Sequence, residues 1–209
     1  MLLLENDGDR PMGDERLIEF SDNVIVFGAD LSLNRPGFCR IQLSKEADKY
    51  KINSVNVISI DNKSKAKNAS KVRGEKLNDI AEGFSDFISD YIGTPTQLFF
   101  VRETSVNNMY TGGRTSGRAR SGISEVVGVM DYTLWKKADS EWNELYPTTI
   151  KKLITGSGKA EKETVTEYVK EYLGDIEFHN DDESDAAAVA LAWLISNGCI
   201  DHKIKEKEE

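Results

Sequence analysis

An uninterrupted apolar run at residues 186–195 begins directly after the acidic stretch Asp182-Glu183-Ser184-Asp185. The run is too short to span a bilayer, and its composition, followed by Gly198, predicts a buried helix over residues 182–197. Asp182 and Asp185 emerge on one face of that helix because they stand three residues apart. Two carboxylates held this close repel each other, so a cation beside them is expected.

Acidic residues at a helix start usually cap backbone amides and face the positive end of the helix dipole. Capping alone would account for Asp182 and Asp185 if they are considered in isolation. Two distant acids favour another interpretation. Asp30 and Glu103 each follow a short apolar stretch that predicts a buried strand.

The order of predicted elements indicates an α/β fold. Three strands come first and are expected to form an antiparallel meander: residues 23–27, which lead into Gly28-Ala29-Asp30, then 38–43 and 50–60. A helix, a strand, a helix, a strand and two helices follow at residues 70–92, 98–101, 117–137, 148–155, 161–173 and 182–197. This order predicts one mixed five-stranded sheet with helices on both faces.

The domain organisation follows from the same pattern. Residues 23–198 are expected to form a single domain, preceded by an acidic extension at 1–22 and followed by a charged tail at 199–209. The N-terminus turns acidic at Glu5, which does not fit a secretory signal. Cys39 and Cys199 make no disulfide framework, so a cytoplasmic protein is expected. Only two histidines are present, which excludes the common zinc-ligand patterns.

The net charge of −9 argues at first against a nucleic-acid partner, but the charges are unevenly distributed. Residues 1–22 carry −5 and residues 171–185 carry −7, whereas residues 63–76 carry +5. Residues 102–122 and 148–162 carry +3 each. Local fields govern contact, so basic segments of an acidic protein can still follow a phosphate backbone. Solvated surface charge is the simpler explanation for residues 63–76.

Strand ends and a helix start can converge at one crevice of an α/β sheet. Converging carboxylates from Asp30, Glu103, Asp182 and Asp185 would form an oxygen-rich site for a hard divalent cation, Mg²⁺ or Mn²⁺. Such a site can hold two ions roughly 3.5–4 Å apart and promote hydrolysis of a phosphodiester. The predicted acidic site therefore suits chemistry that depends on a divalent metal.

Several motifs, in order and with similar spacing, resemble those of the RuvC-type Holliday junction resolvases. The segment 30–38 carries the opening Asp followed by Gly37-Phe38, and Glu103 stands where that family has a Glu at a strand end. The similarity continues through Gly117-Arg118-Ala119-Arg120, Ile150-Lys151, residues 156–162 and the closing Asp182-x-x-Asp185-Ala186.

The resemblance implies a ribonuclease H-like fold, a homodimer that binds branched DNA, and paired metal-dependent nicks in recombination and repair. It implies that Asp30, Glu103, Asp182 and Asp185 are the metal ligands, with Mg²⁺ as the ion and Mn²⁺ as a substitute. It also places Lys151 and Lys162 at the scissile phosphate, with Lys162 as a catalytic residue.

Some positions depart from the family pattern. Leu31-Ser32 replaces the Pro-Gly that commonly follows the first Asp, and Val106 stands where bacterial members often place an aromatic residue that stacks at the junction. Tyr110 or Met109 could stack there instead. These departures and the acidic extension suggest a phage-encoded or otherwise divergent member.

Basic residues near the motifs are expected to neutralise DNA phosphates, which makes binding sensitive to salt. The candidates are Arg114, Arg118, Arg120, Lys151, Lys152, Lys159 and Lys162, with Tyr110 as the candidate for stacking. Trp135, Trp142 and Trp193 are expected in the core or in a dimer contact. His179 is expected to face solvent.

Two other functions remain open from the sequence. Actin-like phosphotransferases also begin with an Asp, a turn and a Gly after a strand, but they need a duplicated half that 209 residues hardly accommodate. A non-catalytic module that binds branched DNA through a vestigial acidic pocket is the second alternative.

Overall fold

The computed structural model describes residues 18–62, 69–104, 117–174 and 176–203, so the predicted extension and tail lie largely outside the described residues. The strands are β1 (Asn23–Asp30), β2 (Gly37–Glu46), β3 (Lys49–Ser59), β4 (Gln97–Glu103) and β5 (Trp142–Leu145). The helices are α1 (Ala69–Ser89), α2 (Gly117–Ala138), α3 (Pro147–Thr155), α4 (Lys162–Leu173) and α5 (Asp181–Ser196).

The strands form one sheet in the order β3-β2-β1-β4-β5. Strands β1, β2 and β3 are an antiparallel meander, as predicted, and β4 lies parallel to both β1 and β5. A mixed five-stranded sheet is therefore confirmed. Its central strand, β1, is buried from Val24 to Ala29, since it has neighbours on both edges and helices over both faces.

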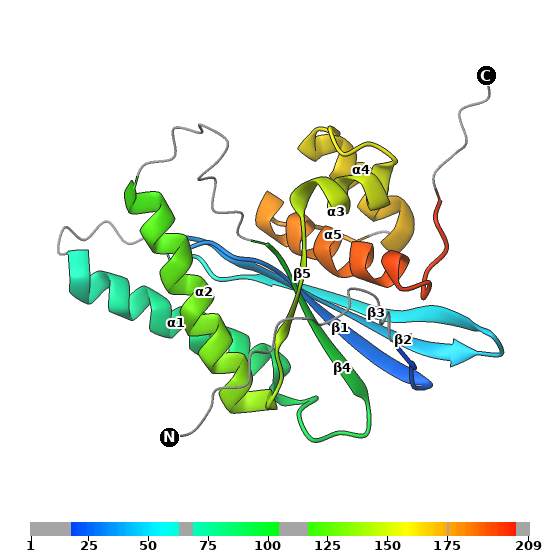
Figure 1. Cartoon of the computed structure of the whole chain (residues 1–209), viewed down its shortest axis with the longest axis horizontal. Helices are drawn as coiled ribbons and strands as arrows, with labels where there is room; N and C mark the ends of the chain where they lie inside the picture. Colours follow the sequence, from blue (N-terminus) through cyan, green and yellow to red (C-terminus); the bar gives the residue numbers. More distant parts are fainter. Residues whose placement is uncertain (1–17, 63–68, 105–116, 175, 204–209) are drawn as a thin grey trace, which may run out of the picture.

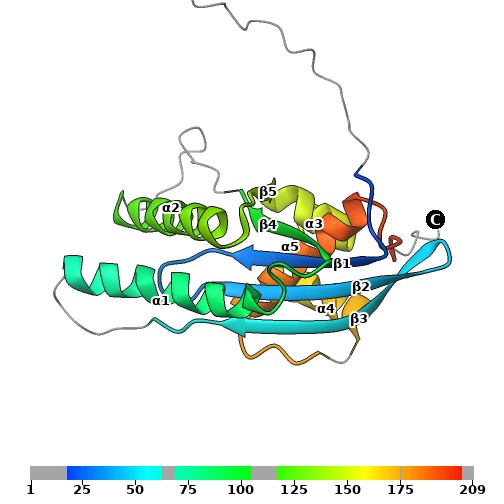
Figure 2. The same ribbon diagram turned by 90° about the horizontal axis from the view of Figure 1, so that it is seen from below.

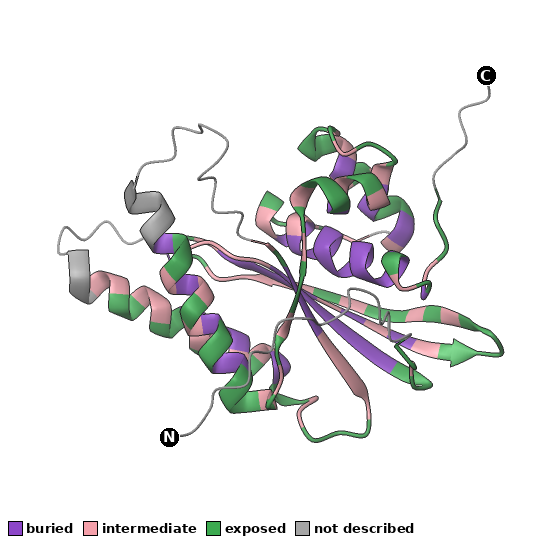
Figure 3. Cartoon of the chain, in the orientation of Figure 1, coloured by how far each residue is buried: buried purple, intermediate pink, exposed green. Residues whose placement is uncertain are grey.

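Helices cover both faces of this sheet (Figures 1 and 2). Helices α1 and α2 pack on one face over a core that includes Phe27, Phe84, Phe100 and Met130. Helices α3, α4 and α5 pack on the other face over a second core. In Figure 3 the buried residues run through β1 and along α5, which is the most deeply buried helix.

The predicted strand at residues 148–155 is wrong, because this segment is helix α3. Its threonines and isoleucines are typical of strands, but Pro147 occupies the first turn of the helix, where the missing amide is harmless. Ile150 and Ile154 are buried at helical spacing, and Gly156 ends the helix with a φ of 80°. The fifth strand is β5, whose four residues are too few to show alternation.

Helix α5 lies very close to β1 and β2 because two glycines leave room for it. A Cβ at Gly28 would stand 2.3 Å from the carbonyl oxygen of Ala186, and a Cβ at Gly37 would stand 2.0 Å from that of Asp182. Any side chain at either position would therefore push the helix away. The sequence of α5 is rich in alanine, which also permits this approach. Within the described ranges, no helix combines the length and apolarity needed to cross a membrane.

Candidate active site

Asp30 and Glu103 are the last residues of two neighbouring parallel strands, β1 and β4. The strands pair up to Ala29 and Arg102, so the next position in register brings the two acids to the same edge of the sheet. Side chains alternate between the two faces along a strand, so Asp30 shares a face with Val26, and Glu103 shares a face with Val101. Both valines belong to the core beneath α3–α5. Asp30 and Glu103 therefore project toward the face that carries α5.

Helix α5 brings the other two acids to this edge. Its N-terminus is capped by the side chain of Asn180, which accepts a hydrogen bond from the backbone N–H of Glu183 at 3.2 Å. Asp182 and Asp185 are consequently not needed for the capping role that acidic residues often play there. The contact between Gly37 and the backbone of Asp182 places this end of the helix against the strand that neighbours Asp30.

Three other acids lie close enough to Asp30 to influence its ionisation. Burial raises the pKa of Asp30, and the nearby charges of Asp185, Glu103 and Asp182 raise it further, to about 7. Lys162 acts in the opposite direction but does not compensate. The ionised form of Asp30 is therefore disfavoured both by the negative charges around it and by its poor access to water.

Glu103 experiences the same surroundings at the rim of the site. The residue is exposed as a whole, but the protein around its carboxylate desolvates it and so raises the pKa of Glu103. The charge of Asp185 raises this pKa too, while Lys162 and Lys151 lower it. Both lysines are therefore close enough to act on the acidic group.

Two cations lie against the acids of α5. The Nζ of Lys162 donates to Oδ2 of Asp185 at 2.5 Å, and the Nε of Arg35 donates to Oδ2 of Asp182 at 2.5 Å. The hydrogen bond to Asp185 raises the pKa of Lys162 above its ordinary value. The pair of acids at spacing i, i+3 thus has the cationic neighbours that the sequence led us to expect.

Among the described residues, no three side chains of His, Cys, Asp or Glu are already grouped as a metal-binding set. The chemistry of the donors nevertheless fits a divalent cation. Asp30 holds a carboxylate whose raised pKa comes from burial and from three neighbouring carboxylates, and a divalent cation would relieve both effects. All the candidate ligands are carboxylates, which hard cations prefer.

A hydrogen-bonded network behind the sheet fixes the strand end that carries Glu103. Arg102 is buried on the opposite face, where its Nε and Nη2 donate to Glu144 at 2.9 and 2.6 Å, and its Nη1 pairs with Asp131. Thr104 also donates to Glu144, at 2.8 Å. Burial alone would raise the pKa of Glu144, but the hydrogen bonds from Arg102 and Thr104 lower it below its ordinary value. Arg102 is thus no surface partner of Glu103.

The candidate DNA-binding residues do not form one cluster as the acids do. Lys151 is on α3 and not on a strand, and its Nζ donates to the backbone carbonyl of Ala160 at 2.6 Å, which supports the loop before α4. Lys152 and Lys159 are exposed. Tyr110 and Arg114 lie outside the described residues, as do Val106 and Met109, and nothing describes the side chains of Arg118 and Arg120 in α2.

Sequence reasoning missed Arg35 and Glu183 as parts of this site. Arg35 belongs to the β1–β2 connection, whose length and Pro36-Gly37 turn gave no sign that its guanidinium reaches Asp182. Glu183 lies between two site acids in the sequence but is buried, with 4% of its surface exposed. The only sign of Glu183 in the sequence was the high density of acidic residues around it. The structure is needed to tell which of these acids is buried and which face the site.

The sequence of the chain is similar to that of one family of known proteins. The family model "Crossover junction endodeoxyribonuclease RuvC" matches residues 26–193. The protein of that name from Rickettsia bellii is 30% identical over 174 residues, which cover 83% of this chain and 98% of the relative. Its counterpart from Rickettsia prowazekii is 27% identical over the same coverage.

Solved structures show the same fold. "T. thermophilus RuvC in complex with Holliday junction substrate" superposes with a TM-score of 0.63 at 18% identity, over 84% of this chain and 96% of that one. A second structure, "Thermus thermophilus RuvC structure", gives a TM-score of 0.59 at 17% identity and covers 83% and 96%. The resemblance in fold extends over nearly the whole of the chain in both of these structures.

Proposed function

The chain belongs to the RuvC family of crossover junction endodeoxyribonucleases, and on this basis we propose how its residues resolve a four-way DNA junction. The family consists of divalent-metal nucleases. The observation that carries the proposal is geometric: Asp30 and Glu103 end the paired parallel strands β1 and β4, and the first turn of α5 packs against Gly37, the β2 partner of Asp30. Neither an actin-like phosphotransferase nor a non-catalytic module is favoured by the family assignment.

Asp30, Glu103, Asp182 and Asp185 are the proposed metal ligands, with Mg²⁺ as the ion and Mn²⁺ able to replace it. When bound, two such ions would activate water and stabilise the leaving oxygen of the phosphodiester. The carboxylates that would hold the ions stand at the ends of β1 and β4 and in the first turn and a half of α5. Asp30 would have to lose its proton, whose pKa is about 7, before it could act as a ligand.

The cations around the acids have separate proposed roles. Lys162 reaches Asp185 from the first turn of α4 and is placed to neutralise charge that develops on the scissile phosphate. Lys151 acts on Glu103 from α3, and its hydrogen bond to Ala160 fixes the loop that leads to Lys162. Arg35 orients Asp182 through its Nε.

DNA beyond the scissile bond would follow a basic surface. Lys152 and Lys159 are exposed on the α3–α4 side of the site, where they can neutralise backbone phosphates. Arg114, Arg118 and Arg120 are proposed to do the same from the β4–α2 connection and α2, and Tyr110 is the proposed stacking residue. Specificity would come from the shape and deformability of the branch point. A cytoplasmic location is proposed because the two cysteines are free and buried.

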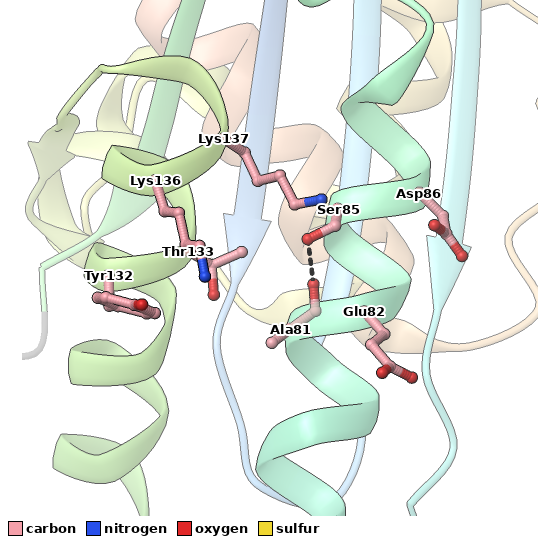
Figure 4. Close-up of a pocket in the computed structure, with 8 residues that line it drawn as sticks. All are labelled: Ala81, Glu82, Ser85, Asp86, Tyr132, Thr133, Lys136 and Lys137. Atoms are coloured by element: carbon pink, nitrogen blue, oxygen red, sulfur yellow. Dashed lines mark hydrogen bonds between the residues drawn. The ribbon is translucent and has the colours of Figure 1, made fainter.

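Paired nicks require two active sites, and we place the contact of a homodimer on α1 and α2. Tyr132 and Trp135 of α2 are 56% and 61% exposed, which is unusual for large aromatic side chains. Beside them, a surface cavity of about 450 Å³ has Glu82 and Asp86 of α1 on one side and two lysines of α2 on the other (Figure 4). In a two-fold dimer the acidic side of one copy can meet the basic side of its partner.

The dimer contact is tested by Trp135→Glu, with Trp135→Phe as the conservative control. Multi-angle light scattering is expected to show a dimer for the native chain and Trp135→Phe, and a monomer for Trp135→Glu, because a buried unpaired charge opposes association. A dimer that persists in Trp135→Glu would place the contact elsewhere.

The activity is tested by Mg²⁺-dependent nicking of a synthetic four-way junction. The native chain is expected to introduce paired nicks, and Asp30→Asn is expected to bind the junction without cutting it. Asp181→Asn, which removes an exposed neighbouring carboxylate that is no proposed ligand, should still cut. Cutting by Asp30→Asn, or no cutting by the native chain, would refute the proposal. Parallel reactions on forks, flaps and linear duplex define the substrate range.

A further inference from the structure

Glu183 is a buried carboxylate that stands between two proposed metal ligands in the sequence but not in space. Successive residues of a helix turn by about 100°, so Glu183 projects away from the face shared by Asp182 and Asp185. Only 4% of its surface is exposed. A buried carboxylate is costly unless hydrogen bonds satisfy its oxygens, so its partners define its role.

Both oxygens of Glu183 accept hydrogen bonds. Oε2 accepts from the backbone N–H of His179 at 2.8 Å and contacts the His179 ring at 3.2 Å. Oε1 accepts from the hydroxyl of Ser59 at 2.9 Å. The side chain of Asn180 donates to the same hydroxyl at 2.8 Å and lies 3.4 Å from Oε1, and it also caps α5. We call Ser59, His179, Asn180 and Glu183 the α5 clamp.

The α5 clamp connects the start of α5 to the sheet at the level of the acids. Ser59 is the last residue of β3 and pairs with Gly37 of β2, which in turn pairs with Asp30 of β1. Gly37 also lies directly beneath the backbone of Asp182. The clamp and the Gly37 contact therefore fix the same end of α5 from two directions, and both lead to Asp30.

We propose that Glu183 is a positioning residue, which sets the distance of Asp182 and Asp185 from Asp30 through its hydrogen bond to Ser59. The inference rests on the proposed function, since it assumes that these acids bind the metal. Without the bond, α5 would keep its core contacts, but its first turn would no longer be fixed to β3. The ligand geometry would then loosen, and metal affinity would fall more than global stability.

The test compares Ser59→Ala, Ser59→Thr and Glu183→Gln with the native chain. Ser59→Ala removes the hydroxyl, and Ser59→Thr retains it in a residue suited to strands. Glu183→Gln leaves one acceptor oxygen for two donors, the His179 N–H and the Ser59 hydroxyl, so one of the two hydrogen bonds is lost. Tyr172→Phe is the matched control, because it deletes a hydroxyl that accepts a 2.6 Å hydrogen bond from the backbone of Lys203 at the far end of α4.

Mn²⁺ affinity, measured by isothermal titration calorimetry, is the primary readout, and the melting temperature in EDTA and junction binding in Ca²⁺ are measured in parallel. Ser59→Ala and Glu183→Gln are expected to weaken Mn²⁺ binding about tenfold, at the low end for groups that orient metal ligands, while junction binding is retained. Ser59→Thr should bind Mn²⁺ within about twofold of the native chain. Tyr172→Phe should lower only the melting temperature.

The outcomes separate this inference from the proposed function. If the native chain binds no Mn²⁺, the proposed metal site is wrong. If the native chain binds Mn²⁺ and the clamp variants bind it equally well, Glu183 has a purely structural role and the inference is overturned. A loss of Mn²⁺ affinity in Tyr172→Phe equal to that in Ser59→Ala would also overturn it, since general destabilisation would then be the cause.

Discussion

Among the acids of the site, Asp30 is the one whose ionisation the surroundings oppose most strongly. Burial and three neighbouring carboxylates oppose its ionisation and raise its pKa to about 7. In the unfolded chain the same carboxyl has an ordinary pKa of 3.8. Metal-free protein therefore loses stability as pH rises from about 4 to about 7, because the folded state retains a proton that the unfolded state has already released.

Asp30→Asn removes this cost, so it is expected to stabilise the protein in EDTA. The melting temperature should rise by roughly 2–6 °C at pH 8, where the penalty is complete, and by less than half as much at pH 5. Differential scanning calorimetry checks both values. Asp90→Asn, which removes an exposed carboxylate, is the control and should change neither. A destabilised Asp30→Asn at pH 8 would contradict the electrostatic argument.

Individual residues of the site were predictable where a strand end marked them. Asp30 and Glu103 follow apolar stretches, and their positions at the ends of β1 and β4 agree with that pattern. Arg35 and Glu183 could not be assigned, because the pairing of one and the burial of the other depend on how α5 meets the sheet. Long-range approach of this kind leaves no periodic signal in the sequence.

At the level of elements, the site depends on the close packing of α5 on β1 and β2. Gly28 and Gly37 permit the approach, and Gly37 lies beneath the residue that carries one of the proposed ligands. A methyl group added at either glycine would therefore displace the helix and move Asp182 and Asp185 together relative to Asp30.

Gly37→Ala is expected to destabilise the protein by about 1–3 kcal/mol and to abolish most Mg²⁺-dependent cutting, because the added Cβ meets the backbone of α5. Chemical denaturation and the junction assay measure the two effects. Gly74→Ala in α1 is the control, since no atom lies within 4 Å of the added Cβ. That variant should be stabilised by about 0.5–1 kcal/mol and remain active. An active, unaltered Gly37→Ala would show that α5 tolerates displacement.

Elements with strong periodicity were predictable, and short ones were not. The meander and the long helices follow from alternation and helical spacing, whereas β5 and α3 did not. Four residues of β5 give too little pattern, and they pair only because β4 offers an edge beside them. In α3 the β-branched residues favoured a strand, but Pro147 and Gly156 set the ends of a helix and tertiary packing of Ile150 and Ile154 stabilised it.

For the whole molecule, a net charge of −9 has to be reconciled with a DNA substrate. The acids proposed to bind metal would lose net negative charge with an ion present, and the exposed Lys152 and Lys159 are the residues proposed to meet DNA phosphates. Affinity should then depend on local phosphate contacts and on salt, and not on the overall charge.

Replacing Lys152 and Lys159 by Gln is therefore expected to reduce the slope of log affinity against log salt by about 1 for each lysine. Fluorescence anisotropy with a labelled junction in Ca²⁺, over a range of KCl concentrations, measures the slope. Lys49→Gln is the matched control, because this lysine is 81% exposed at the β2–β3 turn, away from the site. Equal slopes for the native chain and the double variant would exclude this surface from the DNA path.

Acids from β1, β4 and α5 are proposed to share a divalent cation. Anomalous diffraction from crystals soaked in Mn²⁺ tests this proposal most directly, because it locates the ion without reference to activity. We expect a peak within coordination distance, about 2.0–2.4 Å, of oxygens from Asp30 and at least two of Glu103, Asp182 and Asp185. A peak remote from Asp30, or none at saturating Mn²⁺, would contradict the account.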